Sequence, residues 1–221
     1  MSGFDEKYVI SKFSIIRKSG VFTDEGQFEF PAFDDDGKSF KHLYKQLGID
    51  YPKFYKMNRL CKLVFLTTEY LFKNNNAFNK YPPDEVAMVF SNANSSLDTD
   101  TKHVKSITDK ENYFPKPAVF VYTLPNILLG EISIRHKLNG ENNFFITENF
   151  EAELTAGCAT YILNTTKHKA CILGRADYLG DAFDSSVFFI EAATNPLKED
   201  VLTAENLERK FYTFAGHKNK Y

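Results

Sequence analysis

The sequence of 221 residues has no tryptophan and only three cysteines, Cys61, Cys158 and Cys171. The missing tryptophan excludes little, because 22 phenylalanines and 12 tyrosines supply aromatic side chains for a core. The cysteines are far apart, odd in number and without CxxC spacing, which argues against a disulfide framework and a zinc site. We therefore expect a reducing compartment and no metal or other cofactor.

An excess of charge of one sign is also missing, since 27 Lys and Arg residues face 29 Asp and Glu residues. Because the chain has no excess of positive charge, we expect it to bind neither nucleic acid nor an anionic membrane. No window approaches the roughly 18 apolar residues of a membrane span, and the acidic N-terminus does not resemble an export signal. These absences predict a cytoplasmic protein.

The composition is otherwise that of an ordinary globular chain, with 43% hydrophobic and 25% charged residues. A chain of this length can bury one substantial core, and nothing in it requires a second. We therefore expect a single domain over residues 1–221.

The first half of the chain contains two clear apolar patterns. Residues 8–16 alternate as in a half-buried strand, which Gly20 ends. Residues 33–38, FDDDGK, are interpreted as a solvated turn, because the later Glu of a calcium loop is missing. Apolar residues at helical spacing then predict a long helix over residues 51–74.

The second half alternates strands and helices. We expect strands at residues 85–92, 142–147, 169–179 and 186–193. Helices are expected up to about residue 107 and over residues 124–136, 151–163 and 204–214. This order predicts a layered α/β domain, with a mixed, mostly parallel five-stranded sheet and helices on both faces.

Four segments carry a resemblance to a known family: YKMNRLCKLVFLTTEYL at 55–71, VAMVFSNANSSLDTD at 86–100, LPNILLGEISIRHKLNGEN at 124–142 and CILGRAD at 171–177. In this order they resemble the N-terminal half of the β-ketoacyl synthase family, which has the thiolase-like fold. The match is best over residues 53–190. It implies a thiolase-like half-fold in which Asn126, Gly130 and Gly140 allow close backbone packing.

The resemblance places Asn149 where the family has its nucleophilic cysteine. In the family, that cysteine begins a buried helix whose dipole lowers the thiol pKa for attack on an acyl thioester. A carboxamide has no accessible anionic form, and Glu148, Phe150 and Glu151 cannot carry a thioester either. Cys158 lies more than two turns further on and is interpreted as a small core residue.

The resemblance also implies two catalytic histidines in a C-terminal half, which we expect this chain to lack. Its own histidines are interpreted as solvated or frayed: His42, His103, His136, His168 and His217. Loss of one member of a cooperating catalytic set can cost on the order of a million-fold in rate. We therefore expect a catalytically degenerate protein, a pseudoenzyme.

The leading hypothesis is a non-catalytic subunit that pairs with a complete ketosynthase in fatty-acid or polyketide-type biosynthesis. One alternative is a malonyl-carrier decarboxylase subunit that uses a partner's histidines, with an amide in place of the cysteine. Another is a module that binds an acyl group or an acidic acyl carrier protein, although a solvated charged face explains the same residues. The candidate docking residues are Lys53, Lys56, Arg59 and Lys62.

A half-fold would leave its central helix at 151–163 and the strand at 143–147 without a covering neighbour. We therefore expect a homodimer, or a heterodimer with a complete ketosynthase, formed through this helix or this strand. The candidate interface residues are Asn143, Phe145, Thr147, Ala156 and Cys158.

Overall fold

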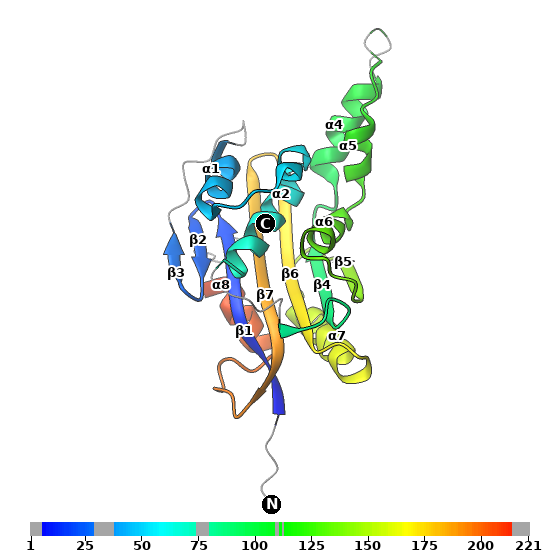
Figure 1. Cartoon of the computed structure of the whole chain (residues 1–221). Coiled ribbons are helices and arrows are strands. Elements are labelled where there is room, and N and C mark those ends of the chain that lie inside the picture. The colour runs from blue at the N-terminus through cyan, green and yellow to red at the C-terminus, as the bar shows by residue number, and fades with distance from the viewer. Residues whose placement is uncertain (1–5, 29–37, 74–79, 109–110, 112, 214–221) are drawn as a thin grey trace, which may run out of the picture.

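The computed structural model describes residues 6–28, 38–73, 80–108, 111 and 113–213. Within these ranges a single sheet of seven strands runs through the molecule, in the order β3-β2-β1-β7-β6-β4-β5 (Figure 1). The strands are β1 (Glu6–Arg17), β2 (Gly20–Thr23), β3 (Gly26–Phe28), β4 (Val86–Asn92), β5 (Asn142–Ile146), β6 (Ala170–Leu179) and β7 (Ala182–Thr194). The turn expected at residues 33–38 and the tail with His217 lie outside the described residues, apart from Lys38.

The α-helices are α1 (Lys38–Leu47), α2 (Arg59–Leu71), α4 (Leu97–Thr108), α5 (Pro117–Phe120), α6 (Ile127–His136), α7 (Ala152–Thr165) and α8 (Ala204–Thr213). Two 3₁₀ helices, η1 (Pro52–Lys56) and η2 (Val121–Thr123), precede α2 and α6. Each expected strand has a counterpart, and so does each expected helix except that over residues 51–74, of which only α2 is α-helical. No described helix could cross a membrane by itself; only residues 117–123 with 127–136, bent by 102°, have the required length and composition.

The predicted strand directions are wrong for most of the sheet. The only parallel pairs among the described strands are β4–β5 and β4–β6. The pairs β1–β2, β2–β3, β1–β7 and β6–β7 are all antiparallel. The sheet is therefore mixed and mostly antiparallel, with seven strands in place of the expected five.

Short turns explain this difference. Two residues, Gly180 and Asp181, join β6 to β7, and so short a connection permits only an antiparallel hairpin. Gly180 has a φ of +62°, the left-handed conformation that such a turn favours. Gly20 does not end the strand region as expected, but begins β2 with a φ of +149°.

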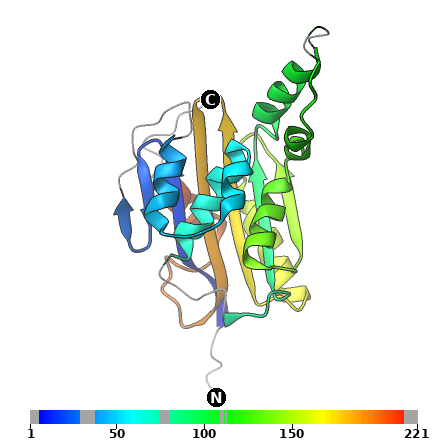
Figure 2. The ribbon, with the colours of Figure 1, turned by 45° about the horizontal axis from the view of Figure 1, so that its top comes forward.

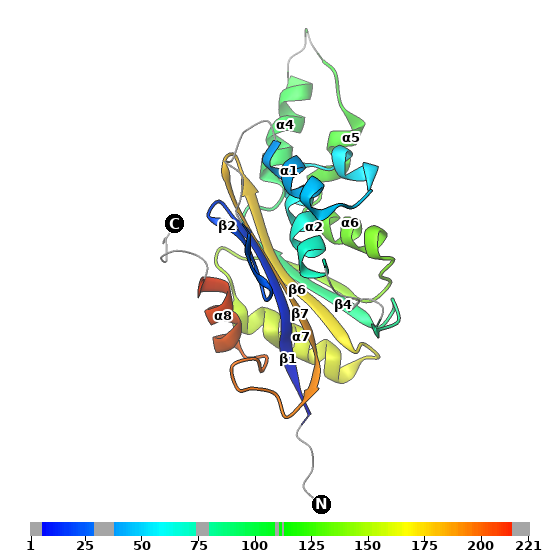
Figure 3. The same ribbon diagram turned by 60° about the vertical axis from the view of Figure 1, so that its left-hand side comes forward.

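Helices cover both faces of the sheet, as predicted. Helices α1, α2 and α6 bury the larger apolar cluster on one face, and α7 and α8 bury the smaller cluster on the other (Figures 2 and 3). Every residue of β4 is buried, as is typical of a strand that is covered on both faces.

The predicted long helix is interrupted between η1 and α2. Pro52 begins η1, and Met57 has an extended conformation that ends it. Asn58 then caps α2, because its side-chain oxygen accepts a hydrogen bond from the backbone N–H of Cys61 at 2.8 Å. A capping asparagine inside a continuous apolar pattern was the available signal for this break.

Three residues were expected to allow close backbone packing, and the backbone approaches most closely at Gly140. A Cβ atom there would lie 2.0 Å from the carbonyl oxygen of Val86 and 3.0 Å from Nε2 of His168. The expectation is wrong for Gly130, where the nearest atom to a Cβ would be 4.0 Å away. Asn126 begins α6 without a side-chain capping bond.

A buried carboxylate joins α2 to α6. Both oxygens of Glu69 accept hydrogen bonds from Arg135, at 2.7 and 3.1 Å, and Nε2 of His136 lies 3.2 Å from Oε1. Burial alone would raise the pKa of Glu69, but the hydrogen bonds from His136 and Arg135 outweigh it and hold this pKa below its usual range. The ionised form of Glu69 is therefore favoured in the folded protein.

Replacement Glu69→Gln is expected to lower the free energy of unfolding at neutral pH by about 1.5–3 kcal/mol, because charged hydrogen bonds are lost. The ionised carboxylate stabilises the wild type fully above the unfolded pKa of about 4.3. This contribution disappears as the pH falls through the lower folded pKa. Urea titrations from neutral to acidic pH should therefore give a flatter pH dependence for the variant. Asp181→Asn, at an exposed turn, is the control and should keep the wild-type slope.

Candidate functional site

The turn between β5 and α7 contains Asn149, the residue at the expected nucleophile position. Since β5 is parallel to β4, and β4 to β6, this turn follows the carboxyl end of a parallel strand. The side chain of Asn149 is exposed, whereas Phe150 and Ala152 are buried against the sheet. Helix α7 begins after Glu151 without a side-chain cap.

Arg175 of β6 donates hydrogen bonds to this turn. Its guanidinium donates to the carbonyl oxygens of Thr147, Glu148 and Asn149 at 3.1–3.3 Å, and to Oγ1 of Thr147 at 3.1 Å. The residue is only 7% exposed. Because the planar guanidinium is rigid and charged, these bonds fix three successive carbonyl groups around position 149.

Asp177 extends this arrangement to the turn that follows β4. Its Oδ2 lies 3.0 Å from Nη2 of Arg175. Its Oδ1 accepts hydrogen bonds from the backbone N–H groups of Ala93 and Asn94, at 2.8 and 2.9 Å. This ion pair, between the buried Arg175 and the half-buried Asp177, therefore joins the turns after β4 and β5.

The described histidines are not gathered at this turn. His42 contacts Gln46 at an exposed position, His103 packs against Phe120, and His136 belongs to the Glu69 cluster. His168 was expected to be solvated, and this is wrong. It is buried, its Nε2 accepts from the backbone N–H of Glu141 at 2.9 Å, and its ring contacts Thr166. These contacts give His168 a structural role beside Gly140.

The cysteines offer no activated thiol. Cys61 and Cys171 are buried, and burial raises the pKa of both thiols. Cys158 on α7 is half-buried, and burial followed by the charge of Glu141 raises its pKa as well. Among the residues that the structure describes, no group of three or more His, Cys, Asp or Glu side chains could hold a metal ion.

Two of the four candidate docking residues are engaged within the chain. Nζ of Lys53 lies 2.7 Å from the buried carboxylate of Glu131. Arg59 donates a hydrogen bond to the hydroxyl of Tyr178 at 3.0 Å. The four do not share one helix, because Lys53 and Lys56 belong to η1 and the others to α2. Lys56 is exposed.

The fourth candidate, Lys62, lies in a group of cations from three helices. Burial, followed by the charges of Lys41, Arg59 and Lys102, lowers the pKa of Lys62. Lys41 belongs to α1 and Lys102 to α4, so the basic region extends beyond the residues chosen from the sequence.

Three of the candidate interface residues lie on or beside β5, which is an edge strand of the sheet. Asn143 and Phe145 are half-buried, and Phe145 packs against the α7 side. Thr147 follows the end of the strand, where Arg175 holds it. The structure therefore brings Asn143 and Phe145 to an open edge and assigns Thr147 to the turn.

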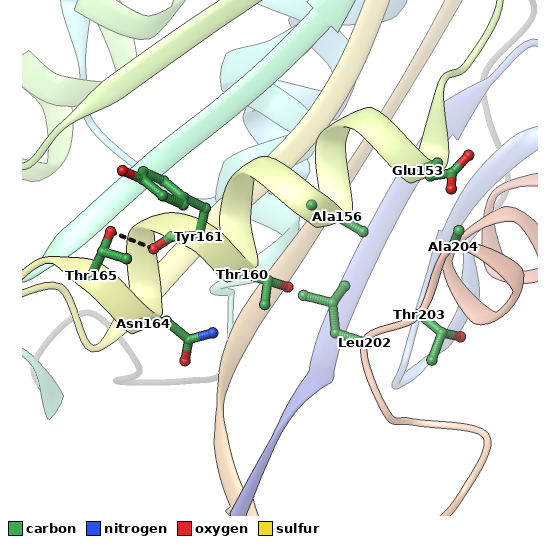
Figure 4. Close-up of a pocket in the computed structure, with 10 residues that line it drawn as sticks. Glu153, Ala156, Thr160, Tyr161, Asn164, Thr165, Leu202, Thr203 and Ala204 are labelled. Atoms are coloured by element: carbon green, nitrogen blue, oxygen red, sulfur yellow. Dashed lines mark hydrogen bonds between the residues drawn. The ribbon is translucent and has the colours of Figure 1, made fainter.

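The other two, Ala156 and Cys158, lie on α7. Ala156 lines an open groove of about 480 Å³ between α7 and the segment before α8 (Figure 4). Residues of α7, both small and large, form one wall, and Leu202 and Thr203 lie on the other. Tyr161 and Leu154 of α7 are exposed. The outer face of α7 is thus partly apolar and is not covered by the described part of the chain.

Sequence reasoning did not identify Arg175 and Asp177 as a functional pair. The available signal was the presence of two charged residues in the otherwise apolar strand CILGRADYL. Their partners lie 26–28 and 83–84 residues away in sequence, so the contacts depend on the strand order.

No protein-family model matches the sequence, and no curated protein matches it either. Solved structures do match. The ishigamide ketosynthase/chain length factor is 15% identical with a TM-score of 0.59, over 84% of this chain and 62% of that chain. The AntDE:AntF complex, a type II PKS acyl-carrier protein with its ketosynthase bound to the hexaketide, is 12% identical with a TM-score of 0.63, over the same shares.

A third structure, the ketosynthase ApeO in complex with its chain length factor ApeC from Xenorhabdus doucetiae, is 10% identical with a TM-score of 0.52. It matches over 83% of this chain and 78% of that chain. This chain thus covers less than two thirds of the length of the first two matched chains. The architecture around the β5–α7 turn and these structural similarities together show that the chain has a ketosynthase-like half-fold.

Proposed function

We propose that this chain is a non-catalytic ketosynthase-like subunit that assembles with a complete ketosynthase in polyketide-type or fatty-acid biosynthesis. The observation that carries the proposal is Asn149 in the β5–α7 turn, with its carbonyl group held by Arg175. A carboxamide cannot form the acyl thioester on which condensation depends. The similarity to ketosynthase and chain length factor structures supports a role beside an active partner.

The outer face of α7 is the proposed contact with the synthase. Ala156 lines its groove, Cys158 is half-buried, and Leu154 and Tyr161 are 43% and 68% exposed. Apolar side chains at positions three and four apart form one stripe along a helix. Such a stripe beside a groove fits a partner surface of complementary shape.

In co-expression with a complete ketosynthase and its carrier protein, we expect the chain to copurify with the synthase and to be required for full product formation. Tyr161→Glu should reduce copurification about tenfold or more, because it places a charge in an apolar interface. Asn149→Ala and Asn149→Cys should leave the product rate unchanged. Purified wild-type and variant complexes would be compared by light scattering and product analysis.

The variants at position 149 separate the hypotheses. If the chain supplies a decarboxylation site that uses a partner's histidines, Asn149→Ala will abolish malonyl-carrier decarboxylation. Lys137→Glu, at an exposed position after α6, is the control for a charge change away from the groove. A chain that neither copurifies with the synthase nor affects its product would contradict the proposal.

Binding of an acidic acyl carrier protein is the second candidate function. It is favoured by the group of Lys41, Arg59, Lys62 and Lys102, whose mutual repulsion contributes to the lowered pKa of Lys62. An acidic surface would relieve this repulsion. Of the residues chosen from the sequence, Lys56 and Lys62 remain the candidates for such contacts, because Lys53 is paired with Glu131 and Arg59 donates to the hydroxyl of Tyr178.

A further inference from the structure

Helix α8 lies beside α7 on the sheet and is held mainly by its own loop (Figure 3). Of its ten residues only Leu207 and Phe211 are buried. The side chains of Asn206 and Arg209 donate hydrogen bonds to carbonyl groups of the preceding loop, within residues 198–201. An element with so few buried apolar side chains belongs to the part of a fold that opens locally at low cost.

Arg17 of β1 makes the one hydrogen bond that joins α8 to the sheet within the described part of the chain. Its Nη2 donates to the carbonyl oxygen of Phe211 at 2.9 Å, and its Cζ lies 5.0 Å from the centre of the Phe211 ring. Phe211 also stacks on Phe150, with the ring centres 4.2 Å apart. Since Phe150 follows Asn149 in the chain, Arg17 attaches α8 next to the β5–α7 turn.

Arg17 is itself held by Asp184 of β7. The two residues lie opposite each other in register, and Nε of Arg17 donates to Oδ2 of Asp184. Ser186, two positions along β7, faces the same side of the sheet. In the described part of the chain, Nη1 of Arg17, Oδ1 of Asp184 and Oγ of Ser186 are buried without a hydrogen-bond partner. Such atoms favour a conformation that lets water reach them, so they weaken the attachment of α8.

The charge of Asp184 also affects this attachment. Burial raises the pKa of its carboxyl group; the charge of Arg17 opposes this effect, that of Asp177 adds to it, and that of Arg175 opposes it. These are the charged groups that face Asp184 from β1 and β6, whereas α8 contributes the uncharged ring and carbonyl group of Phe211. Detachment of α8 would expose Asp184 further, and its pKa would then fall towards the unfolded value of about 3.9.

The sign of the pH dependence follows from this difference. Because the pKa of Asp184 is higher with α8 attached than with α8 detached, the protonated carboxyl group favours attachment. This contribution is complete below about pH 3.9. It is lost as the pH rises through the raised pKa of the attached form.

Movement of α8 would change the groove beside α7. Leu202, Thr203 and Ala204, the first residue of α8, line the wall opposite α7. The backbone N–H of Leu202 donates to the carbonyl oxygen of Tyr8 at 2.8 Å and keeps this end of the loop on β1. The hinge for α8 is therefore at Thr203, between the attached loop and the helix.

We propose that α8 is a pH-sensitive cover, which lies on the sheet when Asp184 is protonated and turns away at Thr203 when Asp184 is ionised. Turning away widens the α7 groove and exposes Phe150 beside Asn149. The inference does not depend on the proposed function, because the movement of α8 belongs to the chain by itself.

Hydrogen exchange of the full chain between about pH 4 and about pH 8, corrected for the intrinsic pH dependence of amide exchange, would test this inference. We expect the protection of residues 204–213 to fall about tenfold or more as the pH rises, because each unit of pKa difference changes the attachment equilibrium tenfold. Amides of β4 and β6 are the internal reference and should keep their protection relative to one another.

Two variants connect the effect to Asp184. Asp184→Asn cannot ionise and should keep α8 equally well protected at both ends of the pH range. Asp181→Asn, in the exposed turn of the same hairpin, is the matched control and should retain the wild-type pH dependence. If Asp184→Asn does not fold, the pH profile of the wild type still decides, because it requires no variant.

Phe211→Ala provides a test of the attachment itself. It removes the ring that lies between Arg17 and Phe150, so α8 should exchange about tenfold faster or more at every pH, while β4 and β6 keep their protection. Protection of α8 that does not change with pH in the wild type, or a pH dependence that survives Asp184→Asn, would overturn the inference. Failure of a synthase to copurify would concern the proposed function and would leave these exchange rates unchanged.

Discussion

Gly140→Ala is expected to lower the free energy of unfolding by more than about 4 kcal/mol, a value typical only of severe structural conflict. The added Cβ atom would lie 2.0 Å from the carbonyl oxygen and 2.8 Å from the carbonyl carbon of Val86. These are backbone atoms of a strand buried on both faces, so they cannot move aside as a flexible side chain would. Urea denaturation followed by circular dichroism would measure the effect.

Two other glycines provide matched controls for this prediction. A Cβ atom at Gly130 in α6 would find its nearest neighbour at 4.0 Å, and one at Gly157 in α7 would find none within 4 Å. Alanine at these helical positions should be neutral or should stabilise the protein by up to about 1 kcal/mol. Equal stability of Gly140→Ala and Gly130→Ala would show that the 138–142 segment does not pack against β4 as described.

Arg175→Met is expected to cost about 3 kcal/mol of stability, the lower end of the usual effect of breaking a buried ion pair by removing one partner, because Asp177 is only half-buried. The variant leaves Asp177 without its counterion and removes the bonds to the carbonyl groups of Thr147, Glu148 and Asn149. Methionine fills much of the same volume, so the loss is chiefly electrostatic. Thermal and urea denaturation would give the size of the effect.

Two further variants distinguish the contribution of the charge of Arg175 from that of its planar hydrogen-bonding group. Arg175→Lys keeps a charge near Asp177 but not the planar group that contacts three carbonyl groups, so it should recover only part of the stability. Adding Asp177→Asn to Arg175→Met should also recover part of the stability, because no half-buried carboxylate then remains without a counterion. Hydrogen exchange should become faster in residues 147–151. If Arg175→Met kept the stability and the hydrogen-exchange rates of the wild type, Arg175 would not hold the β5–α7 turn as described.

The individual elements could be predicted because their signals are local. The alternation in residues 8–16 and the small, apolar residues of 151–163 reflect burial of one face of a strand or helix. Strand direction depends on which elements become neighbours, and β1 pairs with β7 across more than 160 residues. Apolar runs such as Val187 to Ile190 fit both parallel and antiparallel buried strands.

In the candidate site too, features of a single segment could be predicted from the sequence, whereas contacts between distant segments could not. The expectation that Asn149 occupies the nucleophile position comes from counting along one segment, and its inability to act as a nucleophile follows from the chemistry of a carboxamide. The hydrogen bonds from Arg175 to the β5–α7 turn depend on β6 lying beside β4 and β4 beside β5, which no local sequence pattern indicates. Likewise, Lys53 resembled a surface residue in sequence but is paired with Glu131 of a helix more than 70 residues away.

Strand β4 contributes side chains to the apolar clusters on both faces of the sheet. Val86, Met88 and Phe90 belong to the cluster under α2 and α6, whereas Ala87 and Val89 belong to the cluster under α7. Detachment of either helical layer would expose the same strand to water, so the two layers lose their stability together. A protein bound at α7 would therefore also reduce local opening of α6, by mass action alone and without any change of shape.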